Sequence, residues 1–217
     1  NEFGVNYKFG KLGLNASAYN TDWQDRNLTK SVTTGQGDSG DTDVIFLTGV
    51  NQKHSGVELE TNYMVNDMLD LMFVASFGNW KFDGDANGNY QETEYNSEGQ
   101  AVGYTTTEYA YALDGLYVGD MPQTSYVLGV TLKPIKDLRI QAIHKMYDKN
   151  YSDWSPSARE FDGTNDDADR AQVWEAPSYN RLDLHMSYKL PKVKDLDMML
   201  TANIFNVLDE VYVQDAV

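Results

Sequence analysis

Apolar and polar residues alternate with a period of two along much of the chain. In residues 3–9 the odd positions are apolar or aromatic, and the pattern resumes at residues 12–18 after a two-residue link. A period of two predicts a β-strand with one apolar and one polar face. A link of two residues between two such strands predicts a tight hairpin.

Six later segments repeat this alternation, so we predict eight strands in total. These segments are residues 57–63, 71–78, 126–132, 138–142, 182–188 and 198–204. No helical periodicity of comparable strength accompanies them. The pattern therefore predicts an all-β chain built from antiparallel, up-and-down strands.

The predicted links between strands alternate in length. The short links are residues 10–11, 66–70, 133–137 and 189–195, and the long links are residues 31–43, 82–121 and 148–177. Short turns at one end and long loops at the other are typical of a transmembrane β-barrel, with short periplasmic turns and long extracellular loops. A soluble sandwich or barrel also alternates along its strands but does not sort its links by length.

The acidic residues of the chain are concentrated in the long links. The chain has 33 acidic and 17 basic residues, a net charge of −16, and no cysteine. Residues 31–44, 82–121, 148–177 and 208–217 contain 22 of the acidic residues and 3 of the basic ones, so the predicted wall is nearly neutral. An acidic rim argues against a nucleic-acid surface, and the lack of cysteine excludes a disulfide scaffold.

Polar faces and aromatic strand ends fit the same interpretation. Arg139, Asp183 and His185 lie mid-strand, where a closed soluble core would make them costly and a wet lumen would not. Rings near strand ends are typical of interfacial girdles, although β-propensity alone also favours them. The rings in question are Tyr7, Phe9, Trp23, Tyr63, Trp80 and Tyr188.

Three segments resemble the C-terminal part of TonB-dependent outer-membrane receptors. Residues 55–60 read SGVELE, similar to a Gly-x-Glu-x-Glu strand of that family, and residues 178–188 read SYNRLDLHMSY, similar to its penultimate hairpin. Residues 200–212 read LTANIFNVLDEVY, which resembles the Asn-x-Phe-Asn-x-x-Asp-x-x-Tyr signature near the end of the barrel. Their order and spacing also agree, so the resemblance covers nearly the whole chain.

The resemblance implies a 22-stranded barrel of the bacterial outer membrane, of which residues 1–217 are a C-terminal part of about eight strands. It implies a plug domain and a TonB box, and we expect these and the last strand to lie outside this sequence. It further implies TonB as a partner and TonB-dependent uptake of a nutrient such as a siderophore, cobalamin, haem or a glycan. A surface lipoprotein lid is a further possible partner that no motif indicates.

Residues 83–94 match the spacing of a twelve-residue calcium loop. Asp83, Asp85 and Asn87 would supply side-chain oxygens, Asn89 its carbonyl oxygen, and Glu94 two carboxylate oxygens. The alternative is an acidic turn-rich loop, because Asp-Gly and Asn-Gly are ordinary turn dipeptides. Residues 162–169 are also rich in acidic side chains but lack the required glycine.

Ligand contacts are expected in the long loops. Aromatic and basic residues gather in or beside residues 148–177, where rings could stack on a sugar or an aromatic chelate, or pack against each other. These residues are Tyr147, Tyr151, Trp154, Arg159 and Trp174.

No catalytic pattern accompanies these residues. The three histidines fall into no metal spacing, and no phosphate-binding glycine motif occurs, so we predict that the protein is not an enzyme. The alternatives to a transport receptor are a passive porin or small adhesin barrel, and a soluble secreted β-protein that binds calcium or sugar.

Overall fold

The computed structural model describes residues 1–34, 41–161, 168–214 and 216, and it is an antiparallel β-structure. The elements in these residues are β1 (Glu2–Phe9), β2 (Leu12–Thr34), β3 (Asp41–Asn66), β4 (Leu69–Phe82), β5 (Ala86–Tyr95), β6 (Ala101–Tyr111), β7 (Thr124–Leu132), β8 (Leu138–Asp148), β9 (Asn150–Tyr151), α1 (Pro156–Arg159), β10 (Glu160–Phe161), β11 (Glu175–Ala176), β12 (Tyr179–Lys189) and β13 (Met199–Ile204). No helix in these residues has the length and hydropathy needed to cross a membrane.

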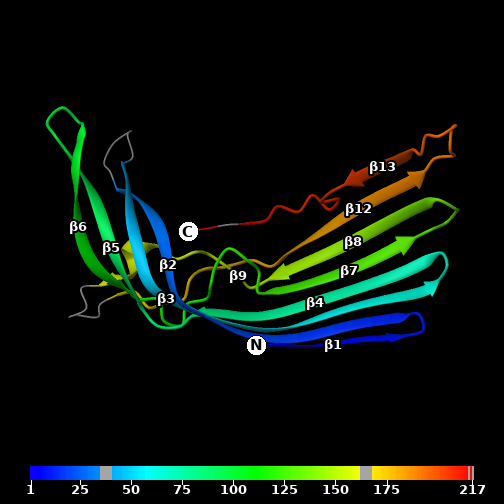
Figure 1. Ribbon diagram of the computed structural model, residues 1–217, viewed down its shortest axis with the longest axis horizontal. Coiled ribbons are helices and arrows are strands. Elements are labelled where there is room, and N and C mark those ends of the chain that lie inside the picture. The colour runs from blue at the N-terminus through cyan, green and yellow to red at the C-terminus, as the bar shows by residue number, and fades with distance from the viewer. Residues whose placement is uncertain (35–40, 162–167, 215, 217) are drawn as a thin grey trace.

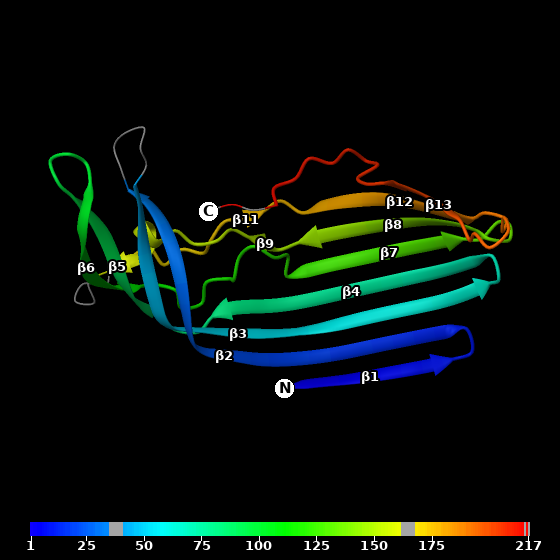
Figure 2. The ribbon, with the colours of Figure 1, turned by 45° about the horizontal axis from the view of Figure 1, so that its top comes forward.

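Eight of the strands form a single open wall. They pair antiparallel in the order β1, β2, β3, β4, β7, β8, β12 and β13, which is also their order along the chain. The turns that join them lie together at one end of the wall, and the long connections lie together at the other end (Figures 1 and 2). The up-and-down topology and the sorting of links by length are confirmed.

The register places the apolar side chains of the wall on one face. One row of directly opposed residues crosses the wall from β1 to β13 and is apolar throughout. This row is Phe9, Leu12, Tyr63, Leu71, Val130, Ala142, Leu184 and Ile204. Directly opposed residues share a face, so the period of two in the sequence becomes one continuous apolar surface that is suited to lipid.

The apolar face ends at a definite level near the long connections. Ala18, Val57 and Phe77 are opposed in its last row on β2, β3 and β4. The next row on the same face is Asn20, Ser55 and Asn79, and the one after it is Asp22, Lys53 and Lys81. This change from apolar to polar side chains marks the outer edge of the hydrocarbon layer.

Beyond this level β2 and β3 leave the wall together. The register shifts between Trp23 and Arg26 and again between Arg26 and Leu28. Asp25 and Gly49 both have positive φ, 52° and 68°, and the Asp25 amide donates to the side chain of Asn51 at 2.8 Å. Irregularities of this kind bend and twist a strand pair, and the two strands turn upward in Figure 1.

The long connections contain more regular structure than the sequence predicts. Residues 82–121 are not one long loop, because β5 and β6 form a hairpin that pairs with the outer part of β3. The connection from β8 to β12 contains β9, α1, β10 and β11, and β10 pairs with β6. Both connections therefore contain short strands that the eight predicted strands did not include.

A hydrophobic core lies within these connections, outside the wall. It gathers residues of β3, β5, β6 and the end of β4, together with residues of the connections that follow β6 and β8. Its buried members are Ile45, Leu47, Val50, Phe82, Ala86, Tyr111, Leu113, Leu116, Tyr151, Trp154 and Val173. We call this part of the molecule the outer subdomain. It lies at the end of the wall where the long connections are, and we call this end the mouth.

Candidate ligand-facing surface

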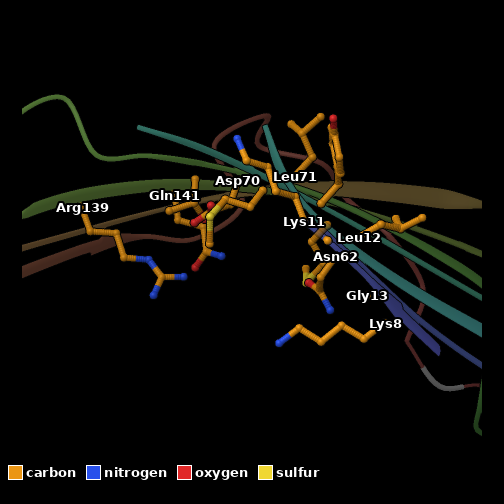
Figure 3. A pocket seen from close by; sticks show the side chains of 14 residues that line it. Lys8, Lys11, Leu12, Gly13, Asn62, Asp70, Leu71, Arg139 and Gln141 are labelled. Atoms are coloured by element: carbon orange, nitrogen blue, oxygen red, sulfur yellow. The ribbon is translucent and has the colours of Figure 1, made fainter. Parts of the chain in front are cut away.

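The second face of the wall is polar. One row of opposed residues on it runs from β4 to β13 and consists of Asp70, Thr131, Gln141, His185 and Asn203. Figure 3 shows Lys8, Asn62 and Arg139 extending to one side of the sheet, whereas Leu71 extends to the other. In a membrane barrel whose apolar face meets lipid, this polar face lines the lumen.

Four aromatic side chains meet on the polar face, at and just beyond the level where the apolar face ends. Tyr19 and Trp23 come from β2, His54 from β3 and Trp80 from β4. The imidazole of His54 stacks on Trp80 with 5.4 Å between ring centroids and lies 6.4 Å from the ring of Trp23. The indole N–H of Trp80 donates to the Tyr19 hydroxyl at 2.9 Å. We call this set the lumenal aromatic cluster.

Two glycines make room for the cluster. A Cβ atom on Gly56 would collide with the Tyr19 hydroxyl, and one on Gly78 would lie 2.9 Å from the Trp80 ring. Gly56 is directly opposite both Tyr19 and Gly78. The two rings therefore lie flat over bare backbone, which only glycine allows at such a close approach.

The cluster carries a positive group at its outer edge. The guanidinium of Arg26 lies 5.4 Å from the centroid of the Trp23 ring and donates to the Gln52 side chain at 2.6 Å. Gln52 also lies 3.3 Å from Nε2 of His54. Burial, together with the charge of Arg26, lowers the pKa of His54, so the imidazole is neutral at neutral pH.

A second group on the polar face ties β8, β12 and the C-terminal segment together. Asp183 is 1% exposed, and its carboxylate accepts from Lys145 at 2.9 Å and from the Asn206 amide at 2.9 Å. Arg181 lies 3.6 Å from the same carboxylate. The charge at Asp183 is thus compensated, and Asn206 belongs to the signature that resembles the end of the receptor barrel.

The five residues expected to contact ligand are divided between two environments. Tyr151, Trp154 and Arg159 are buried in the outer subdomain. Tyr151 stacks on Tyr117 at 4.2 Å, and Arg159 donates to the backbone carbonyl of Asp169. These contacts favour the alternative in which the loop packs against itself.

The other two expected residues keep surface. Trp174 is exposed, and its carbonyl accepts from the Ser152 amide at 2.8 Å. Tyr147 lies on the polar face at a centroid distance of 5.0 Å from Tyr179, which stacks on Tyr212 at 4.2 Å. Tyr147 therefore belongs to a ladder of three rings at the mouth of the wall.

The residues of the predicted calcium loop are divided between strand β5 and the connection before it. Asn87, Asn89 and Glu94 belong to β5, whereas Asp83 pairs with Lys53 at 2.8 Å and Asp85 pairs with Arg170 at 2.8 Å. In the described residues, no group of three or more His, Asp or Glu side chains is placed to hold a metal ion. Residues 162–167 of the second acidic segment lie outside the described residues.

Calcium binding at residues 83–94 remains a prediction. The compact loop conformation on which it depended is replaced by the hairpin of β5 and β6, because its residues pair with β3 and with each other. Calorimetric titration of the full-length receptor with calcium, with Asp83→Ala as the comparison, tests it directly. Heat in the wild type that the variant lacks would support a site, and no heat in the wild type would exclude one.

Four of the six rings considered for an aromatic girdle lie on the face that a girdle requires. Tyr7, Phe9, Tyr63 and Tyr188 lie on the apolar face by register. Trp23 and Trp80 lie on the polar face instead, in the same rows as Gln52 and His54. The sequence alternation could have predicted this placement, because both tryptophans fall on the polar positions of the period-two pattern in their strands.

Comparison with known proteins agrees with this architecture. The family model for the β-barrel of TonB dependent receptor-like proteins matches residues 1–207. A solved structure described as the CymD monoaromatic hydrocarbon channel matches with a TM-score of 0.50 and 15% sequence identity, over 94% of this chain and 57% of that chain. At that identity the likeness shows the fold alone. No match was found among the curated proteins.

The chain belongs to the TonB-dependent receptor β-barrel family. It is part of a barrel wall of the bacterial outer membrane, with an apolar face toward lipid and a polar face toward the lumen. The family and the continuous apolar face together exclude the soluble secreted alternative. The chain spans 57% of the length of the matched structure.

Proposed function

We propose that the chain forms part of the wall and the outer mouth of a receptor that imports a nutrient through the outer membrane by coupling to TonB. The observation that carries this proposal is the polar row of the lumenal face, from Asp70 on β4 to Asn203 on β13, together with the outer subdomain at the end of the wall. A lumen of this kind accommodates a hydrated ligand and a plug domain. The resemblance and the family imply a siderophore, cobalamin, haem or a glycan as the nutrient.

Uptake by cells that express the full-length receptor tests the proposal. A panel of iron chelates, cobalamin, haem and glycans would be supplied, and accumulation would be measured with and without the receptor gene. We expect one of them to accumulate only in cells that contain both the receptor and TonB. A proton ionophore should abolish that accumulation, because TonB transmits the proton-motive force.

The same experiment separates an energised receptor from a passive channel. A passive porin would admit its solute at a rate that neither the ionophore nor deletion of TonB changes. It would also make proteoliposomes swell in solutions of small solutes, without any energy source. Receptor-dependent accumulation that survives the ionophore would therefore contradict the proposal.

A further inference from the structure

The lumenal aromatic cluster is built as a surface that can receive a ring. Trp23 is 48% exposed, although it contacts both His54 and Arg26. The other three rings are half-buried and held in place, since Trp80 bonds Tyr19 and stacks on His54. Because the three half-buried rings are held in place beside the exposed indole of Trp23, a ligand ring can stack on that indole at a low entropic cost.

The second observation that supports a binding site here is that Arg26 lacks an acidic partner. In the described part of the chain it forms no ion pair with a carboxylate, and its polar contact is the neutral side chain of Gln52. The chain carries a net charge of −16, so a guanidinium without an acidic partner is unusual here. An arginine in this position is free to pair with a bidentate oxyanion.

We propose that Trp23, Arg26 and the lumenal aromatic cluster form a subsite for a planar aromatic anion, such as an aromatic carboxylate or phenolate group of the imported ligand. The ring of that group stacks on the indole of Trp23, and its oxyanion pairs with the guanidinium of Arg26. The subsite rests on the proposed function, because it lies on the path that a ligand takes through the mouth.

The chemistry of the cluster selects for both features of such a ligand. A neutral aliphatic group would gain neither stacking nor an ion pair, and an aromatic cation would meet the charge of Arg26. The neutral imidazole of His54 adds no second positive charge, so a single oxyanion suffices. The acidic rim lies further out, in the outer subdomain.

Binding of three small probes to the purified full-length receptor tests the subsite. Benzoate has the ring and the charge, benzamide has the ring alone, and cyclohexanecarboxylate has the charge alone. Saturation-transfer NMR in detergent measures each dissociation constant in the millimolar range. We expect benzoate to bind about tenfold more tightly than either of the other probes, which corresponds to about 1.4 kcal/mol.

Three variants assign the roles of Arg26 and Trp23. Arg26→Gln should weaken benzoate binding about tenfold and leave benzamide binding unchanged. Trp23→Ala should weaken both, and Trp23→Phe should restore part of the affinity because a ring remains. Tyr104→Ala is the matched control, since Tyr104 is also an exposed ring but lies on β6, away from the cluster; it should change neither constant.

Circular dichroism of each variant confirms that the barrel has folded. Equal affinity for the three probes, or benzoate affinity that survives both Trp23→Ala and Arg26→Gln, would overturn the proposal. The measurement needs neither TonB nor transport. If the uptake experiment fails while benzoate binds as expected, the transport mechanism is wrong and the subsite remains; the converse result removes the subsite alone.

Discussion

Gly56 is the residue at which the wall and the lumenal aromatic cluster depend on each other most directly. Gly56→Ala would place a Cβ atom against the Tyr19 hydroxyl and 2.7 Å from the Phe77 carbonyl oxygen. The backbone contact cannot relax by rotation of a side chain, so we expect a loss of about 1–3 kcal/mol in the free energy of unfolding. Urea unfolding of the full-length receptor, followed by its tryptophan fluorescence, measures this loss.

Gly13→Ala provides the control for that measurement. Gly13 also lies on the polar face, but the nearest heavy atom to its Cβ position is the Asn62 carbonyl oxygen at 3.9 Å. This change should be neutral or slightly stabilising, because alanine restricts the unfolded chain more than glycine does. Equal losses for the two variants would show that the rings over Gly56 adapt freely.

Asp183 stabilises the wall electrostatically, because its carboxylate contacts the cations Lys145 and Arg181 and a backbone amide. Asp183→Asn leaves Lys145 and Arg181 facing each other without an anion, and we expect it to destabilise the receptor by about 1–3 kcal/mol. Glu58→Gln is the comparison on the same face, because the polar partner of Glu58 is Ser17 at 3.4 Å. Unfolding midpoints that shift equally for the two variants would contradict the role assigned to Asp183.

The strands of the wall could be predicted from the sequence because each has one face toward lipid and one toward a polar lumen. That arrangement imposes a strict period of two, as in residues 3–9 and 12–18. The lumenal aromatic cluster could not be predicted, because Tyr19, His54 and Trp80 are far apart in sequence. Only the register between β2, β3 and β4 brings them together.

The hairpin of β5 and β6 escaped prediction for the opposite reason. Its outer part extends beyond its pairing with β3, so neither face needs to be apolar there, and threonine occurs on both faces, at Thr93 and Thr105. Alternation disappears when both faces meet water. Asp-Gly and Asn-Gly dipeptides at its start then favoured a loop, although Gly88 in fact pairs within the strand.

Asp85, at the start of this hairpin, links two connections of the outer subdomain. Its environment predicts that the stability of this link depends on pH. The hydrogen bond from Arg170 lowers the pKa of Asp85, helped by the amides of Leu113 and Asp114. The stability from this link is therefore fully present above the unfolded pKa of about 3.9. It is lost as the pH falls through the still lower pKa of the folded state.

Hydrogen exchange can follow this link at two backbone positions. The amides of Leu113 and Asp114 both donate to Asp85 at 3.0 Å, so Asp85→Ala should speed their exchange at neutral pH. Asp83→Ala is the matched control, because Asp83 pairs with Lys53 instead, and it should leave both amides protected. Protection that persists in Asp85→Ala would show that the link does not hold the connection.

The two ends of the wall should differ in accessibility on living cells. A peptide tag inserted between Glu98 and Gly99, in the turn of the β5–β6 hairpin, should bind an antibody on intact cells. The same tag inserted after Ile135, in the turn between β7 and β8, should bind only after the outer membrane is permeabilised. Both sites are exposed turns, so flow cytometry compares like with like; the reverse pattern would invert the assigned orientation.

At the scale of the whole molecule, the outer subdomain is a single packed body made from several connections. Trp154, which follows β9, packs against Phe82 at the end of β4 and Tyr111 at the end of β6. Ile45 and Leu47 of β3 belong to the same core. The core therefore joins segments that are far apart in the sequence and depends on the register of β3 and β4.

The shared core changes how the mouth of this receptor can diverge or be engineered. In a barrel with independent loops, a single loop can be grafted from a relative and carry its specificity with it. Here a graft of residues 148–177 alone would remove Tyr151, Trp154 and Val173 from a core whose other members stay behind. The smallest unit that can be exchanged is the whole outer subdomain, and new specificities arise by substitution on its surface or by replacement of all its parts together.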